Sequence, residues 1–67
     1  MNQTPQHLIR LLLANGYLFK RARGYHQIFY NSITNKTVIV PVHGNEDIKK
    51  GTFLAILQQA GIDKSEI

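Results

Sequence analysis

The sequence predicts an α+β fold in which a helix, three antiparallel strands and a second helix follow one another, with both helices on one face of the sheet. Apolar residues recur at helical spacing near both ends of the chain, in residues 8–12 and 53–60. Between them, residues 17–40 contain three runs rich in aromatic or β-branched residues, separated by short turn-forming segments. In a two-layer sandwich, the apolar stripe of each helix is buried against one face of the sheet.

The first helix is expected from Pro5 to Asn15. The hydroxyl of Thr4 can cap its free amides, and Pro5 suits the first helical position because its missing N–H has no partner there. Gly16 is the expected left-handed stop. The apolar stripe consists of Leu8, Leu11 and Leu12, flanked by Ile9 and Leu13, and indicates core packing.

Three strands are expected next, over Tyr17–Ala22, Tyr25–Tyr30 and Thr37–Val40. The first connection is short and predicts a hairpin, while residues 31–36 form a turn of backbone-bonding side chains. Pro41 should end the third strand or lie at an edge, since it has no N–H to donate to the ladder.

Alternation along the second strand places His26, Ile28 and Tyr30 on one face and Tyr25, Gln27 and Phe29 on the other. Both sets are mixed, so the pattern does not choose the face that the helices cover. We expect Phe19 and Phe29 in the core and Tyr25 or Tyr30 at the surface.

The second helix should begin within residues 48–51, place an apolar face against the sheet and end at Gly61. That face consists of Phe53, Ile56, Leu57 and Ala60. Asp63 with Glu66 can cap one further turn. No repeat or linker divides residues 1–67, so we expect a single domain.

Composition limits the possible functions. A chain of 67 residues gains only roughly 3 to 5 kcal/mol of net stability from its core. It has no cysteine, which excludes disulfides, thiolate zinc sites and cysteine nucleophiles. The apolar stretch of residues 8–14 is interrupted by Arg10 and is too short to span a bilayer. We therefore expect a soluble, cytoplasmic protein with no membrane partner.

The positive charge is concentrated in the first two-thirds of the chain. Residues 1–45 carry Arg10, Lys20, Arg21, Arg23 and Lys36 with no acid, whereas residues 46–67 carry three lysines and four acids. A basic surface favours nucleic acid, an anionic membrane or an acidic protein, and charge alone does not distinguish them.

His26 is the leading chemical candidate. It follows the Gly24 hinge and the cations Lys20, Arg21 and Arg23. An imidazole can move protons near neutral pH, and neighbouring cations can hold a phosphate. RNA supplies its own nucleophile, the ribose 2′-hydroxyl, so cleavage to a cyclic phosphate needs no metal or cofactor. The alternative is an ordinary exposed strand histidine, which local spacing alone favours.

The remaining candidates are weaker. His43 is either a second acid or base, if the strand ends meet, or a loop histidine bonded to backbone. His7 is expected to face solvent or to pack. Scattered histidines without a ligand motif indicate no metal site. From their immediate surroundings, Lys49 and Lys50 are expected to be solvated lysines at the start of a helix. Exposed tyrosines among cations can stack unpaired bases.

The order of these segments resembles the HicA (YcfA-like) family of small bacterial toxins over nearly the whole chain. The similar segments are residues 8–17, Arg23-Gly24-Tyr25-His26, residues 37–43, residues 48–52 and residues 56–62.

The resemblance implies a double-stranded-RNA-binding-domain-like fold and an mRNA interferase that cleaves transcripts and arrests growth. It implies His26 as the catalytic residue, because the family's Gly-Ser-His type motif corresponds to Gly24-Tyr25-His26. The family usually has serine where Tyr25 stands. His43 and the lysines Lys49 and Lys50 also match the family pattern, the lysines as contacts for RNA or the antitoxin. A HicB-type antitoxin is the implied protein partner.

Two other functions remain open. A noncatalytic RNA-binding module would use the same basic hairpin and tyrosines and would bind RNA without forming product. A protein-interaction domain would use the positive face only for an acidic partner such as the antitoxin.

Overall fold

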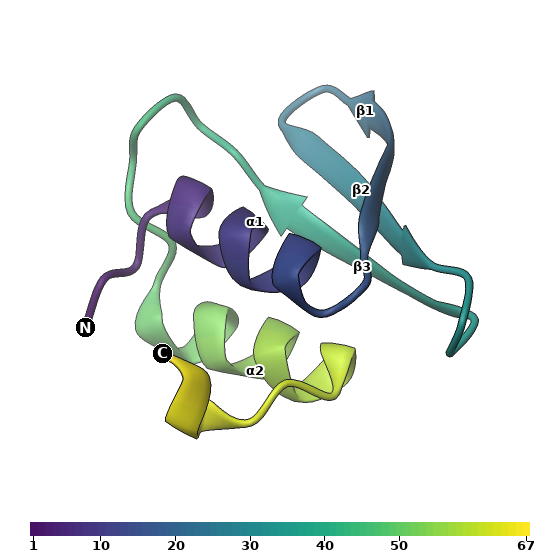
Figure 1. Ribbon diagram of the computed structural model, residues 1–67. Helices are drawn as coiled ribbons and strands as arrows, with labels where there is room; N and C mark the ends of the chain where they lie inside the picture. Colours follow the sequence, from purple (N-terminus) through teal and green to yellow (C-terminus); the bar gives the residue numbers. More distant parts are fainter.

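The computed structural model describes residues 1–67 and has the predicted order of elements (Figure 1). These are α1 (Pro5–Ala14), β1 (Leu18–Arg23), β2 (His26–Asn31), β3 (Lys36–Pro41), α2 (Lys50–Ala60) and the short 3₁₀ helix η1 (Lys64–Glu66). The strands form one antiparallel sheet in the order β1-β2-β3. The α+β, α-β-β-β-α fold expected from the sequence, with its double-stranded-RNA-binding-domain-like arrangement, is confirmed.

The predicted capping residues are confirmed, although α1 ends at Ala14, one residue before the expected Asn15, which is its C-cap. The Thr4 hydroxyl accepts a hydrogen bond from the backbone N–H of His7 at 3.2 Å, and Pro5 occupies the first turn of α1. Gly61 terminates α2 with φ of 75°, the left-handed conformation that glycine adopts without strain. Asp63 caps η1 by accepting from the backbone N–H of Ser65 at 2.9 Å.

The core is one cluster of twelve buried apolar residues between the helices and the sheet. Val38 and Val40 of β3 are completely buried, as are Leu8, Leu12 and Phe53 of the helices. Both helices pack on β3 more than on β1. The helix layer therefore covers β3 and part of β2 and leaves β1 and the turn of the β1–β2 hairpin projecting beyond it (Figure 1).

Tyr17 is part of this core and not of the first strand, where the sequence had placed it. Its ring is 1% exposed, and its hydroxyl donates to the carbonyl oxygen of Ala60 at 3.0 Å. The bond ties the exit of α1 to the last residue of α2. Because it satisfies a buried hydroxyl, it also fixes how the two helices lie against each other.

The expectation that Phe19 is a core residue is wrong. Phe29 is buried, but Phe19 is 55% exposed and touches the Phe29 ring only edge-on, with centroids 5.8 Å apart. The reason is the position of its strand. All six residues of β1 are exposed, because β1 lies outside the area that the helices cover.

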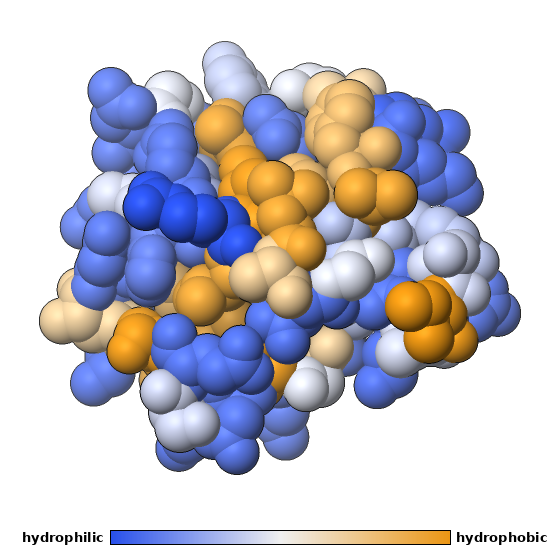
Figure 2. Space-filling model, in the orientation of Figure 1, coloured by the Kyte–Doolittle hydropathy of each residue, from blue (hydrophilic) through white to orange (hydrophobic).

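Figure 2 shows an apolar band on the molecular face that carries α1, and Leu13 of that helix is half exposed.

Candidate nucleic-acid interface

The hairpin turn before β2 sets the position of His26. Arg23 and His26 are paired residues, so only Gly24 and Tyr25 lie in the turn. Gly24 has φ of 58°, whereas the φ of Tyr25 is not positive. A left-handed glycine followed by an ordinary residue is typical of a type II′ turn, which suits the twist of a hairpin. Tyr25 is thus a turn residue and not the first residue of β2, as the sequence had suggested.

The structure decides which face of β2 is open, a question that the sequence left unanswered. Phe29 and Asn31 are buried, so their face of the strand lies under the helices. By alternation, His26, Ile28 and Tyr30 lie on the opposite face. His26 is exposed, at the end of the central strand and between Arg23 and Pro41.

The register brings two arginines to the same face as the histidine. Arg23 pairs with His26 and Arg21 pairs with Ile28, and directly opposed residues project their side chains to the same side of a sheet. We call this surface the open face. It is defined by Arg21, Arg23, His26, Ile28, Tyr30 and Ile39.

Lys20 joins the open face through an irregularity in β1. The register shifts between Phe19 and Arg21, so Lys20 is the extra residue of a β-bulge. Its ammonium lies 5.4 Å from the centroid of the Tyr30 ring, a cation–π distance. All three cations of the predicted hairpin site are therefore near the open face.

The two candidate tyrosines have different surroundings. Tyr30 is half-buried, its ring lies under the Lys20 ammonium, and its hydroxyl bonds the side chain of Asn35. Tyr25 is 64% exposed. Of the two, Tyr25 offers the more accessible ring.

His43 lies against Tyr25. The two rings stack with centroids 4.2 Å apart and planes inclined by 23°. The backbone N–H of Val42 also donates to the Tyr25 carbonyl oxygen at 2.7 Å, which extends the β2–β3 ladder by one bond. The ends of strands two and three do meet, and the ring that His43 contacts there is Tyr25. The sequence alone did not predict this stack, although the β2–β3 register, continued by one residue, places Tyr25 opposite Val42, next to His43.

The other predicted residues lie away from the open face. Lys49 is the N-cap of α2 and lines a shallow depression with His43, Glu46 and Asp47, and Lys50 is the first residue of the helix. Acidic residues and lysines are thus mixed at the start of α2. His7 is half-buried and stacks on Phe53 with centroids 6.1 Å apart, so it is a packing residue.

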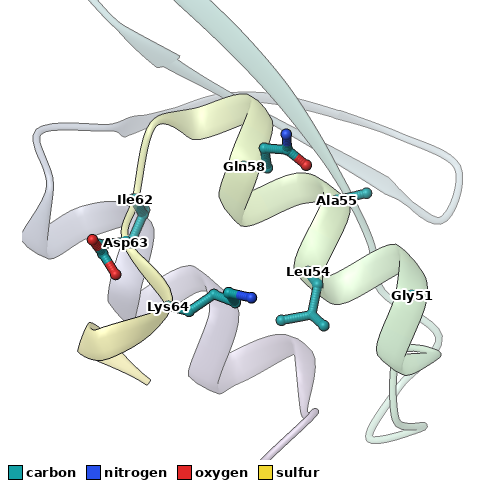
Figure 3. A pocket seen from close by; sticks show the side chains of 7 residues that line it. All are labelled: Gly51, Leu54, Ala55, Gln58, Ile62, Asp63 and Lys64. Carbon is teal, nitrogen blue, oxygen red and sulfur yellow. The ribbon is translucent and has the colours of Figure 1, made fainter.

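The largest hollow of the surface is elsewhere, between α2 and the C-terminal segment (Figure 3). Its lining side chains include Leu54, Gln58, Ile62 and Lys64. None of them is a histidine or a residue that the sequence singled out for chemistry. No group of three or more histidine, cysteine or acidic side chains gathers anywhere in the structure, and no helix is long and apolar enough to cross a membrane.

In a comparison with known protein families, a family model described as the HicA toxin of bacterial toxin-antitoxin systems matches residues 5–62, which include both helices and all three strands. A comparison with curated protein sequences gave no match.

Proposed function

Since the chain belongs to the HicA toxin family, the toxins of bacterial toxin–antitoxin systems, we propose that it is a metal-independent endoribonuclease that cleaves mRNA with His26 as its catalytic residue. The observation that carries the proposal is the grouping of one exposed histidine with Arg21 and Arg23 on the open face. A proton-transfer group and two phosphate-binding groups on one surface are what RNA cleavage requires.

The chemistry uses the nucleophile that RNA carries. His26, as general base, would take the proton of a ribose 2′-hydroxyl, and that oxygen would attack the adjacent phosphorus. The bond from phosphorus to the 5′ oxygen then breaks, and the leaving oxygen takes up a proton. The products are a 2′,3′-cyclic phosphate and a free 5′-hydroxyl. The same imidazole, once protonated, can instead serve as the general acid for the leaving oxygen.

The surrounding residues bind the substrate. The guanidinium groups of Arg21 and Arg23 would hold the phosphate and offset the charge that develops on it, with the Lys20 ammonium beside them. Gly24 would allow the RNA backbone to approach the turn, because it has no side chain and, apart from the flanking residues, nothing lies within 4 Å of the place where a side chain would begin. Tyr25, beside His26, would contact RNA close to the cleaved phosphate, and Lys49 and Lys50 would contact more distant parts of the RNA or the antitoxin.

The protein partner follows from the family. A toxin of this kind acts with an antitoxin, and we propose a HicB-like protein that covers the open face. Its surface should be acidic, because residues 1–45 carry only positive charges. The target, mRNA, places the activity in the cytoplasm.

The test is cleavage of a long single-stranded RNA in EDTA by the parent, His26→Ala and His7→Gln. His7→Gln is the matched control, because it removes an imidazole that packs on Phe53, away from the sheet. We expect cyclic-phosphate ends from the parent and the control, and a rate lower by about 10²- to 10⁴-fold for His26→Ala. His26 is exposed, so its variant should keep the parental melting temperature.

Other outcomes identify other functions. Salt-sensitive RNA binding without product, in the parent itself, would show the noncatalytic binding module. Tight antitoxin binding without RNA affinity would show a protein-interaction domain. Equal cleavage by all three proteins would remove His26 from the mechanism.

A further inference from the structure

The proposed cleavage mechanism gives no role to the stacked rings of Tyr25 and His43. One face of the Tyr25 ring lies on His43, with 4.2 Å between the centroids. The tyrosine is nevertheless 64% exposed, and His43 is exposed as well. The other face of the Tyr25 ring is therefore available to a flat ligand.

The backbone on both sides holds the pair in place. The closing pair of Arg23 and His26 fixes the turn that carries Tyr25. The hydrogen bond from the Val42 N–H to the Tyr25 carbonyl fixes the distance between this turn and the segment that carries His43. A tyrosine has only two rotatable side-chain bonds, so a ring placed in this way loses little entropy when a ligand stacks on it.

The position of the turn indicates the ligand. Tyr25 directly precedes His26, and consecutive Cα atoms are about 3.8 Å apart, so the turn that carries Tyr25 adjoins the end of the open face. An RNA strand whose phosphate lies at His26, Arg21 and Arg23 would pass this turn and bring a neighbouring base within reach of the Tyr25 ring. Every nucleobase has a flat face that stacks on aromatic rings, but within a duplex that face is covered by its neighbours.

We propose that Tyr25, backed by His43, is a stacking platform for an unpaired nucleobase, so that the substrate is RNA that is single-stranded at the nucleotide next to the cleaved phosphate. The inference rests on the proposed ribonuclease activity for the position of the cleaved bond, but the platform itself is a binding site. In this assignment His43 is a positioning residue that supports the ring and transfers no proton.

The test measures binding in the His26→Ala background, where the RNA stays intact. The probe is a short single-stranded RNA that contains one 2-aminopurine, whose fluorescence falls when it stacks on an aromatic ring. Tyr25→Ala is expected to weaken binding by about 5- to 150-fold and to abolish the quenching. Tyr25→Phe should keep both. Phe19→Ala is the matched control, because it removes a ring of similar exposure from the other side of the sheet.

A fully paired RNA duplex provides the second arm. Its bases are covered, so Tyr25→Ala should change its affinity by less than about twofold. Single-strand affinity unchanged by Tyr25→Ala, an equal loss for single strand and duplex, or no single-strand binding at all would each overturn the platform.

The role of His43 is tested by exchanging its chemistry while keeping its shape. His43→Phe retains a flat ring without a titrating group, whereas His43→Ala removes the support. We expect His43→Phe to bind and to cleave like the parent and His43→Ala to lose affinity. Inactive His43→Phe that still binds RNA would instead make His43 an acid or base and overturn its positioning role.

The two proposals fail separately. Parental cleavage in EDTA together with unchanged binding by Tyr25→Ala removes the platform and leaves the ribonuclease. Tyr25-dependent stacking by a parent protein that forms no product keeps the platform and removes the ribonuclease.

Discussion

Replacing Asn31 by alanine should remove a large part of the stability of this domain. Asn31 is the one buried polar residue of the chain, with 4% of its surface exposed. Its amide nitrogen donates to the Asn15 carbonyl oxygen at 3.1 Å. Its side-chain oxygen accepts from the backbone N–H groups of Ile33 and Thr34 at 2.9 and 3.2 Å. One side chain therefore joins the exit of α1 to the turn between β2 and β3.

The expected loss follows from these three bonds. A hydrogen bond within a protein contributes about 0.5 to 1.5 kcal/mol net, and more when its removal leaves a buried group unpaired. Asn31→Ala should thus lower the free energy of unfolding by about 2 to 4 kcal/mol. A domain of this size has only roughly 3 to 5 kcal/mol to lose. The melting temperature should fall by about 4 to 8 °C for each kcal/mol.

Urea unfolding followed by circular dichroism measures this loss. Ser32→Ala is the control, because Ser32 is the exposed neighbour in the same turn and should change stability by less than about 0.5 kcal/mol. Asn31→Asp keeps both acceptor bonds but replaces the donor with a buried carboxylate oxygen facing the Asn15 carbonyl oxygen, so it should also lose stability at neutral pH. A loss below about 0.5 kcal/mol for Asn31→Ala would refute the reasoning.

Three further predictions concern the turn, the C-terminal cap and the charges. Gly24→Ala should lower the free energy of unfolding by about 1 kcal/mol, because Gly24 has a φ of 58°. Gly51→Ala in α2, where a side chain also meets open space, should instead raise it by about 0.5 to 1 kcal/mol. Equal effects of the two substitutions in thermal melts would contradict this prediction. The backbone N–H and side chain of Ser65, with Lys64, hold the pKa of Asp63 below 3.8, so its contribution is present above that pH and lost as pH falls through the lower folded value. Melts of the parent and Asp63→Asn should therefore converge as the pH falls through the lowered pKa of Asp63, and a gap that widens on acidification would refute the assignment. Arg21→Ala and Arg23→Ala should each reduce the slope of log affinity against log salt for single-stranded RNA by about 0.7, while Lys64→Ala, in η1, should leave it unchanged.

Local signals predicted the fold because each acts within a few residues. Thr4 and Pro5 begin α1 and Gly61 ends α2, as their chemistry requires. The strand limits each differ by one residue from the prediction. At Tyr17 the reason is a long-range contact, because its hydroxyl donates to the carbonyl oxygen of Ala60. Phe19 was misplaced because strand composition does not reveal how far a helix layer extends across a sheet.

The candidate site was predicted in part. The sequence brought Arg21, Arg23 and His26 together through the expected hairpin, but it could not say that all three share the open face. That result depends on the register and on the helices covering Phe29. The stack of Tyr25 on His43 joins residues eighteen positions apart in the chain. No local spacing records such a contact.

The bulge at Lys20 also bears on the solubility of the free protein. β1 is an edge strand, and an edge with regular spacing can pair with the edge of a second molecule and start aggregation. The register shift between Phe19 and Arg21 interrupts that spacing in the middle of the strand. The cations at and after the interruption, Lys20, Arg21 and Arg23, repel a second copy of the same edge. Regular pairing along the whole of β1 is therefore disfavoured, so this edge of a toxin released from its antitoxin is protected from pairing with itself.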